Sequence, residues 1–401
     1  MKQKIQFIAL LFVIVGVIPS ESLYAERLTD LGNDSLRSES EVITSFNLHY
    51  VNESSYNISG GIKRGYSNLN NIYLQSRINL GRLISVNSLE LGIKPMINYC
   101  RKSNQYFGTV QGVSNIEAEN MFTLMELWVQ KHFYEDKLSV LIGLYDLNSE
   151  FDVKTSSGLF STPSQGIGSE LGLSGKKGPS IFPYPGMAVR VSVKPYENFE
   201  IKAVAVDGVP NYSDAFVKVR FNSSEGLLMA SEIDCKVKAE TENIIGIGYW
   251  AFTAKHPVLA AQDVLSFGEE AQGNNGAFVF FDVPELYSYS KDGIISACFR
   301  YGIANKKFNE VSSHLTCGCV LNSLFFHQDE LGFNFSCGFL NKQYASENGL
   351  YSSEKMYEAT YVYTLIEQIK IQPTLLYVSH PSAGANIKDA FGGSIRVILD
   401  L

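Results

Sequence analysis

The chain lacks the features that mark several large classes of protein. Charged residues make up only 18% of its 401 positions, proline occurs only 12 times, and periodicity of the helical kind is scarce. No apolar run after residue 25 has the ~20 residues that a membrane-spanning helix needs. The metalloprotease helix, the nucleophile-elbow pentapeptide and the P-loop are also missing, so no motif of these kinds indicates an enzyme.

The chain has few cysteines and fewer basic than acidic residues. Six cysteines in a chain of this length do not make a disulfide framework. His314 precedes Cys317 and Cys319, but this spacing fits no standard zinc site, and small apolar wall residues are the simpler interpretation. A net charge of -8 argues against nucleic acid as a partner.

The first residues have the layout of a secretory signal peptide. Two lysines precede an apolar run over residues 5–18, a proline and a serine break it, and small Ala25 follows. We therefore predict that residues 1–25 are cleaved, that 26–40 form an N-terminal extension, and that 41–401 form the fold.

Apolar and polar residues alternate with a period of two along much of the chain. Sixteen candidate strands span residues 41–52, 70–80, 88–101, 119–133, 138–146, 186–194, 199–207, 227–238, 243–254, 275–289, 293–303, 315–327, 331–342, 355–366, 369–379 and 391–401. Short polar turns alternate with longer segments between them. This pattern is typical of an up-and-down barrel with turns at one rim and loops at the other.

The strand GMAVRVSVKP, residues 186–195, poses the question of which face is inside. It has Val189, Val191 and Val193 on one side and Arg190 and Lys194 on the other. A sixteen-stranded barrel leaves an aqueous space at its centre, so inward valines would be costly at ~25 cal/mol per Å². We therefore predict an all-β transmembrane barrel with apolar side chains toward lipid and charges toward a wet lumen.

The same alternation predicts which side chains line the pore. On strand 119–133 it predicts that Met125, Leu127 and Val129 face outward. The pore-lining candidates across the barrel are Glu126, Trp128, Arg190, Glu232, Arg300, Glu358 and Arg396. Opposed arginines and carboxylates would bind polar solutes and set up a field across the lumen. The alternative is that each is an ordinary solvated lumen residue in a salt bridge.

The segment 146–185 is the best candidate for a constriction. It is rich in Gly, Ser and Pro, and loops of this length are usually functional or disordered. Folded into the lumen, it would contribute Asp146, Glu150, Asp152 and Phe160 to the narrowest part. The alternative is an external loop that leaves the pore open.

The last strands are similar in sequence to a known family. YEATYVYTLIEQIKIQPTLLYVSHPSAGANIKDAFGGSIRVILDL, residues 357–401, resembles the closing strands of the carbohydrate-selective porins of the OprB family. GLYDLNSEFD (143–152), FPYPGMAVRV (182–191), IIGIGYW (244–250) and FRYGIANKKFN (299–309) resemble the same family in the same order. The resemblance implies a sixteen-stranded barrel in the bacterial outer membrane.

The resemblance also implies a function. Family members pass monosaccharides such as glucose down a gradient, without a cofactor. The family generally ends in an aromatic residue recognised by the barrel assembly machinery, whereas this chain ends in Leu401. A general-diffusion porin, a structural or adhesive surface barrel and an outer-membrane hydrolase stay open as alternatives, as does assembly into a homo-oligomer.

Overall fold

The structure is a computed structural model. It describes residues 42–401 except 85, 211–214, 218, 220–221, 238–241 and 260–268. The predicted signal peptide (1–25) and N-terminal extension (26–40) lie outside the described residues. None of the described helices is both long enough and apolar enough to cross a bilayer.

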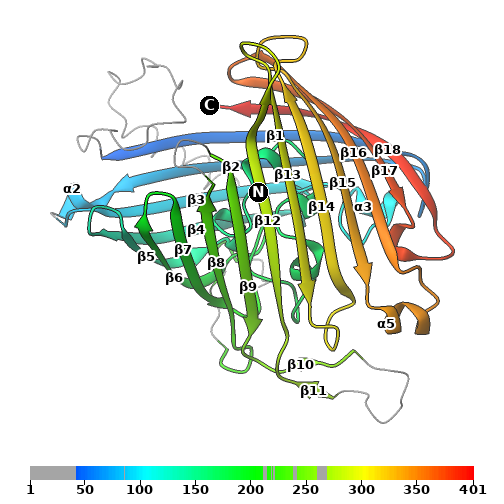
Figure 1. Ribbon diagram of the computed structural model, residues 1–401, viewed down its shortest axis with the longest axis horizontal. Helices are drawn as coiled ribbons and strands as arrows, with labels where there is room; N and C mark the ends of the chain where they lie inside the picture. Colours follow the sequence, from blue (N-terminus) through cyan, green and yellow to red (C-terminus); the bar gives the residue numbers. More distant parts are fainter. Residues whose placement is uncertain are drawn as a thin grey trace.

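Sixteen antiparallel strands form one closed barrel, as the alternation predicts (Figure 1). Each strand pairs with its neighbours in the chain, and β1 closes the barrel against β18. The barrel strands are β1 (Ile43–Gly61), β2 (Gly65–Asn79), β3 (Leu89–Cys100), β4 (Met121–Phe133), β5 (Leu138–Tyr145), β6 (Gly186–Tyr196), β7 (Phe199–Asp207), β8 (Leu227–Lys236), β9 (Ile244–Phe252), β12 (Asn275–Ser288), β13 (Ile294–Ala304), β14 (Val311–Asn322), β15 (Glu330–Leu340), β16 (Ser353–Ile366), β17 (Ile369–Ser379) and β18 (Lys388–Asp400). Because the barrel is closed, every barrel strand hydrogen-bonds to a neighbour on both sides and no edge strand is left free, which a bilayer requires.

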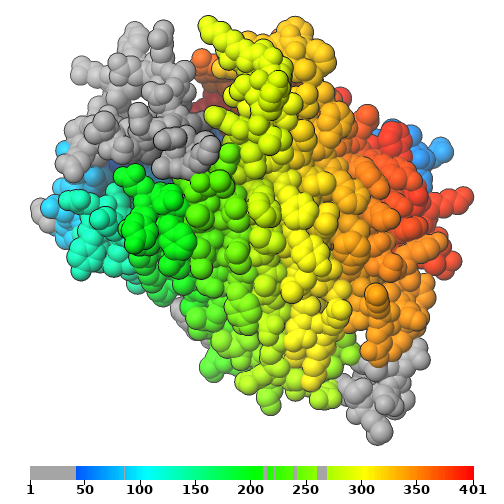
Figure 2. Space-filling model, viewed as in Figure 1, coloured from blue at the N-terminus to red at the C-terminus, as the bar shows by residue number. Residues whose placement is uncertain are grey.

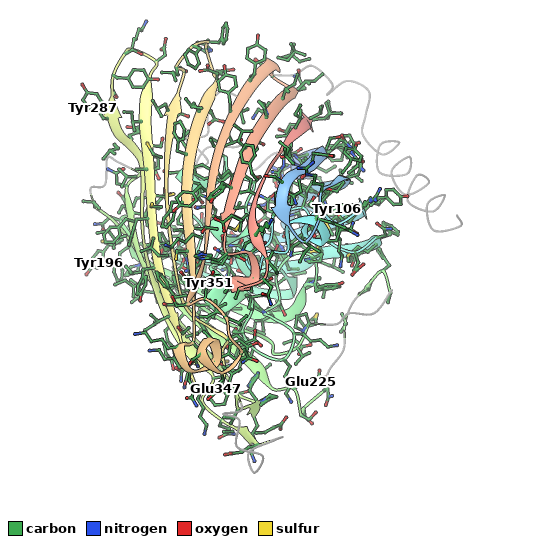
Figure 3. The ribbon with its side chains drawn as sticks, turned by 90° about the vertical axis from the view of Figure 1, so that its right-hand side faces the viewer. Tyr106, Tyr196, Glu225, Tyr287, Glu347 and Tyr351 are labelled. Atoms are coloured by element: carbon green, nitrogen blue, oxygen red, sulfur yellow. The ribbon has the colours of Figure 1, made fainter. Side chains whose placement is uncertain are left out.

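The longest connections all lie at one end of the barrel, which also carries the short β1–β2 turn. Tyr287, near the turn after β12, and Glu347, in the loop after β15, mark the two ends in Figure 3. The long-loop end carries the small hairpin of β10 (His256–Pro257) and β11 (Glu270–Ala271). The short helices are α2 (Leu80–Ile84), α3 (Asn104–Phe107), α4 (Ser169–Gly172), α5 (Lys342–Glu347), η1 (Leu147–Ser149), η2 (Thr155–Ser157), η3 (Pro163–Gln165) and η5 (Pro381–Ala383).

The wall has an apolar outer face and a polar inner face. On β6, Val189 and Val193 are exposed on the outer surface while Arg190 is buried inside. Leu127 and Val129 of β4 and Ile395 and Val397 of β18 likewise point outward. Figure 2 shows that the side chains of neighbouring strands pack side by side over the outside of the barrel. The valines therefore face lipid and the charges face the lumen.

Two details of the strand prediction are wrong. Strands β1 and β2 form a long hairpin joined by residues 62–64, where the prediction has short strands and a long loop. Polar residues on both faces of this hairpin hide its apolar alternation. On β4, a register shift opposite Lys94 and Pro95 leaves Met125 buried rather than outward, because a bulge turns the strand locally.

Candidate functional site

Two loops fold into the interior of the barrel. The β5–β6 loop, residues 146–185, hydrogen-bonds to inward side chains from β8 to β17. The β3–β4 loop, residues 101–120, reaches inward side chains of β1, β16 and β18. The loops also meet each other, since the Asn115 amide donates to the Ser161 carbonyl at 2.7 Å. Together they narrow the lumen from within.

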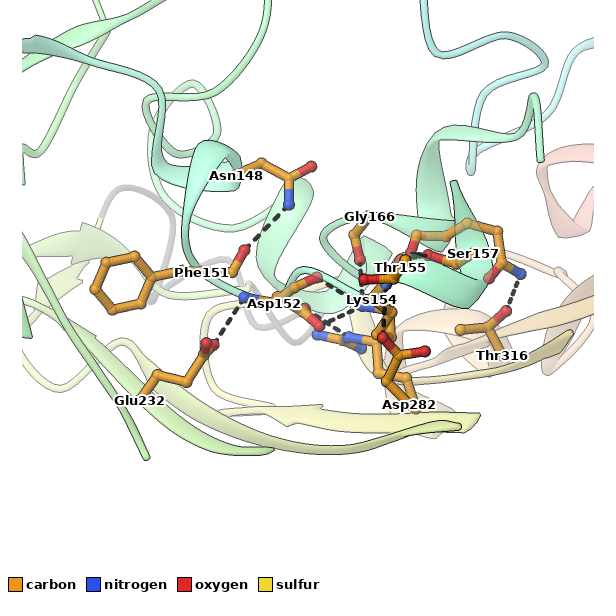
Figure 4. Close-up of polar contacts among 12 residues, drawn as sticks. Asn148, Phe151, Asp152, Lys154, Thr155, Ser157, Gly166, Glu232, Asp282 and Thr316 are labelled. Carbon is orange, nitrogen blue, oxygen red and sulfur yellow. Dashed lines mark hydrogen bonds and ion pairs between the residues drawn. The ribbon is translucent and has the colours of Figure 1, made fainter. Parts of the chain in front are cut away.

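Buried carboxylates of the wall hold these loops by their backbone. Glu232 accepts the amide of Asp152 at 2.7 Å, and Asp282 accepts those of Thr155 and Ser156 (Figure 4). The same pattern recurs on β16, where Glu358 binds Ser161 and Thr162 and Glu354 binds Val110 and Gln111. Carboxylates that accept backbone N–H groups form strong, directional anchors. Glu232 and Glu358 thus bind the loop rather than an open lumen.

Arg300 lies at the centre of the anchored loop. Its Nε donates to Asp152 at 2.6 Å, and its Nη2 donates to Glu170 at 2.7 Å. Lys154 pairs with Asp152 at 2.7 Å, so two cations balance two carboxylates. The side chains of all four residues have no exposed surface. A buried network of this kind holds the loop in one position only while every charged partner is present.

Arg396 holds the β3–β4 loop in a comparable way. Its Nε donates to Glu53 at 2.6 Å, and its Nη2 donates to Ser114 and Asn115 at 3.0 and 2.8 Å. Ser114 in turn donates to Glu53. The seam between β1 and β18 therefore binds one loop while Arg300 on β13 binds the other.

Phe160 packs the tip of the β5–β6 loop onto the wall. It is buried against β14 and β15, where Gly318 and Gly332 leave room for its ring. A Cβ on Gly318 would lie 2.6 Å from the ring, so both the aromatic residue and the small residue are needed. Phe160 is thus an apolar anchor of the loop.

Glu150 and Arg190 form a fixed ion pair on the other side of the lumen. Two parallel hydrogen bonds of 2.6 Å join the guanidinium to the carboxylate. Ser139, Gln130 and Tyr145 complete the shell around the pair. Arg190 is buried, but 31% of the Glu150 side chain is exposed. The buried Arg190 therefore holds the Glu150 carboxylate in a fixed position inside the barrel, with part of its surface exposed.

Glu126 and Trp128 lie beside that pair on β4. Glu126 accepts the Trp128 indole N–H at 3.0 Å and pairs with Lys94 at 3.3 Å. The indole packs over Gly92 of β3, where any side chain would clash. Asp146 caps η1 by accepting the Asn148 amide at 3.0 Å, which fixes the start of the β5–β6 loop. A fifth of the Lys94 side chain stays exposed.

The structure brings some predicted residues together and separates others. It pairs Arg190 with Glu150 and Arg300 with Asp152, whereas Glu358 and Arg396 bind different loops. Sequence analysis missed Asp282, a charge at an inward position of the predicted strand 275–289, and Glu354, which lies one residue before the predicted strand 355–366 and at an inward position of β16. It also missed the role of the β3–β4 loop, for which the length of the loop is the one indication in the sequence. His314 faces inward while Cys317 is exposed outside, which contradicts the weak zinc alternative.

The β3–β4 loop contains a carboxyl group that titrates near neutrality. Glu117 accepts the amides of Ser103 and Asn104 at 2.9 and 3.1 Å. Burial raises the pKa of Glu117 from 4.5 to about 7, against the opposing effect of these amides, and nearby Glu53 adds to the rise. Lys102 lowers it slightly.

We expect docking of this loop to weaken as the pH rises through 7. Between pH 4.5 and about 7 the docked loop keeps a proton on Glu117 that a released loop loses, so higher pH favours release. Hydrogen exchange of residues 101–120, corrected for intrinsic rates, should be faster above this window than within it. Glu117→Gln should flatten this pH dependence of exchange. An unchanged slope in that variant would show that another group causes the pH dependence.

The closed barrel, its apolar outer face and its two inner loops define an outer-membrane porin. The family model of the carbohydrate-selective porins, OprB family, matches residues 63–398. The chain therefore belongs to the OprB family, and it resides in the bacterial outer membrane. No curated protein matches the chain.

Solved structures support the same fold. The high-pH structure of Pseudomonas putida OprB matches with a TM-score of 0.78 and 17% identity, over 89% of this chain and 94% of that one. The outer-membrane channel DcaP of Acinetobacter baumannii matches with a TM-score of 0.56 and 9% identity, over 89% and 96%. At these identities the likeness extends to the fold alone.

Proposed function

We propose that this porin passes neutral monosaccharides such as glucose by passive diffusion. Membership of a carbohydrate-selective family supports a sugar as solute. Passage down a gradient through a water-filled lumen needs no chemical step and no cofactor. The role of individual side chains in choosing the solute is part of the proposal.

The observation that carries the proposal is the fixed pair of Glu150 and Arg190. A sugar ring presents hydroxyls that both donate and accept hydrogen bonds. The exposed carboxylate accepts from hydroxyls, and Lys94 across the β3–β4 wall supplies a donor. Because each charge has a partner, the surface binds polar solutes without attracting one sign of ion strongly.

The two inner loops favour this proposal over a general-diffusion pore. They fill the interior along β12 to β18, so the accessible inward charges include Lys94, Glu150 and Asp234 on the opposite side. A narrow path with polar walls favours small hydroxylated solutes over large or apolar ones. It also allows a current, which a plugged adhesive barrel would not.

Liposome swelling tests the proposal. We expect swelling with glucose to be clearly faster than with a neutral amino acid of similar size, and slow with a disaccharide. Rates that follow size alone would instead support general diffusion. Planar bilayers without any conductance would support the adhesive barrel, and added glucose should reduce the current if it binds in the pore.

A further inference from the structure

Two cations lie close together on the rim of the barrel where β1, β2 and β3 end. Lys63, in the turn between β1 and β2, and Arg101, directly after β3, are both exposed. The Lys63 Nζ lies 5.6 Å from the centre of the Tyr106 ring, and the Arg101 guanidinium carbon lies 5.7 Å from it. Figure 3 labels this tyrosine beside the ribbons of β1 and β2. One aromatic ring therefore keeps two cations on a small area of the rim.

The positive charge of this pair is not neutralised by the surrounding side chains. In the adjoining β3–β4 loop, Glu119 pairs with Lys102 and Glu117 accepts backbone amides. Within the part of the chain that the structure describes, no carboxylate forms an ion pair with Lys63 or Arg101. The chain as a whole has a net charge of -8, so two uncompensated cations at one place indicate an anionic partner.

The backbone that carries Lys63 is firmly held. The buried Asn57 side chain donates to the Gly60 and Lys63 carbonyls at 2.9 and 3.0 Å. The Lys63 amide donates to the Tyr106 carbonyl at 3.2 Å, which joins the turn to the β3–β4 loop. Gly65 leaves room for the Tyr106 ring, since a Cβ there would lie 2.0 Å from it. A partner therefore meets a turn that is already ordered, which lowers the entropy cost of binding.

The pair lies at the height of lipid headgroups. At the usual rise and tilt of a strand, the outward side chains of β1 from Phe46 to Ile58 span about 30 Å along the membrane normal, the thickness of the hydrocarbon core. The turn with Lys63 follows within a few residues. It lies at the end with the long loops, which faces the cell exterior in barrels of this class. The headgroups at this height therefore belong to the outer leaflet.

We propose that Lys63 and Arg101 bind the phosphate groups of a lipid in the outer leaflet. Ammonium and guanidinium groups form charge-assisted hydrogen bonds with phosphate oxygens. Below them the outer wall exposes Ile58, Tyr66 and Tyr99, which the acyl chains of the same molecule can contact. A free phosphate ion would use the charges alone, so the apolar surface beside them favours a lipid. This site is separate from the lumen and does not depend on the proposed passage of sugars.

Native mass spectrometry of the delipidated full-length barrel tests the proposal, with lipid A carrying two phosphates as the probe. We expect the variant Lys63→Gln, Arg101→Gln to bind this lipid roughly tenfold more weakly or worse, because it removes both charged donors. The variant Lys63→Arg, Arg101→Lys keeps both charges and should bind within about threefold of the natural chain. Equal weakening in both variants, or none in the first, would overturn the proposal. Heat-modifiable migration reports that each variant is folded.

A matched control separates a defined site from general attraction between charges. Arg64→Gln removes one positive charge from the same turn but does not touch the Tyr106 ring, so it should change lipid affinity by less than about twofold. Lys63→Gln alone should weaken it roughly fivefold. Equal effects of the two single substitutions would show diffuse attraction and refute the site. Displacement of the lipid by inorganic phosphate at the same concentration would instead identify a site for a free anion.

Discussion

Replacing Arg300 with Met is expected to raise single-channel conductance and remove the preference for monosaccharides. The arginine joins Asp152 and Glu170 of the β5–β6 loop to β13, and all three side chains are buried. Removing it leaves one carboxylate charge unbalanced inside the barrel. Breaking a buried ion pair in this way costs about 3–5 kcal/mol, which shifts the equilibrium constant for docking of the loop by roughly 10²–10⁴-fold.

A second variant separates charge from packing. Arg300→Met with Glu170→Gln restores neutrality, because Lys154 still balances Asp152. We expect this double variant to recover much of the low conductance. Arg64→Met, at an exposed position in the β1–β2 turn, serves as a control that removes an arginine without touching the loop.

Planar-bilayer recording and liposome swelling of the same preparations measure the effect. Normal conductance in a correctly folded Arg300→Met barrel would show that the loop holds its place without the ion network. High conductance in both the single and the double variant would assign the closing role to the shape of the arginine rather than to its charge.

Alternation alone predicts most of the barrel wall. The outward valines of β6 and the inward Arg190 follow from a period of two, which depends only on neighbouring residues. The β1–β2 hairpin escapes this logic, because Asn52, Asn68 and Asn70 place polar atoms on the lipid side. A hydrophobicity pattern cannot identify a strand whose outer face is stabilised by hydrogen bonds between side chains.

The interior is less predictable, since it depends on contacts far apart in the sequence. Glu358 is a recognisable inward charge, but its partners Ser161 and Thr162 lie almost 200 positions earlier in the chain. No local pattern shows that a wall carboxylate accepts backbone amides of a loop instead of meeting solute. The pairing of Arg300 with Asp152 is hidden for the same reason.

Glu150→Gln is expected to weaken sugar binding in the pore and shift ion preference toward anions. The carboxylate is 31% exposed, whereas its partner Arg190 is buried, so the carboxylate is the member of the pair that a solute can touch. A hydrogen bond to a charged group is stronger than one to an amide by about 1 kcal/mol, which corresponds to roughly fivefold weaker binding. The substitution also leaves the Arg190 charge uncompensated.

Arg190→Met should shift ion preference in the opposite direction. It leaves Glu150 charged and without its guanidinium, so cations should be favoured and the carboxylate should lose its fixed orientation. Reversal potentials in a salt gradient measure the two opposite shifts, and titration of the current with glucose measures sugar binding. Glu200→Gln is the matched control, because Glu200 is an inward carboxylate of similar exposure on β7, outside the loop. If Glu150→Gln and Glu200→Gln alter sugar block equally, a general effect of lumen charge explains the result, and Glu150 holds no special position for the solute.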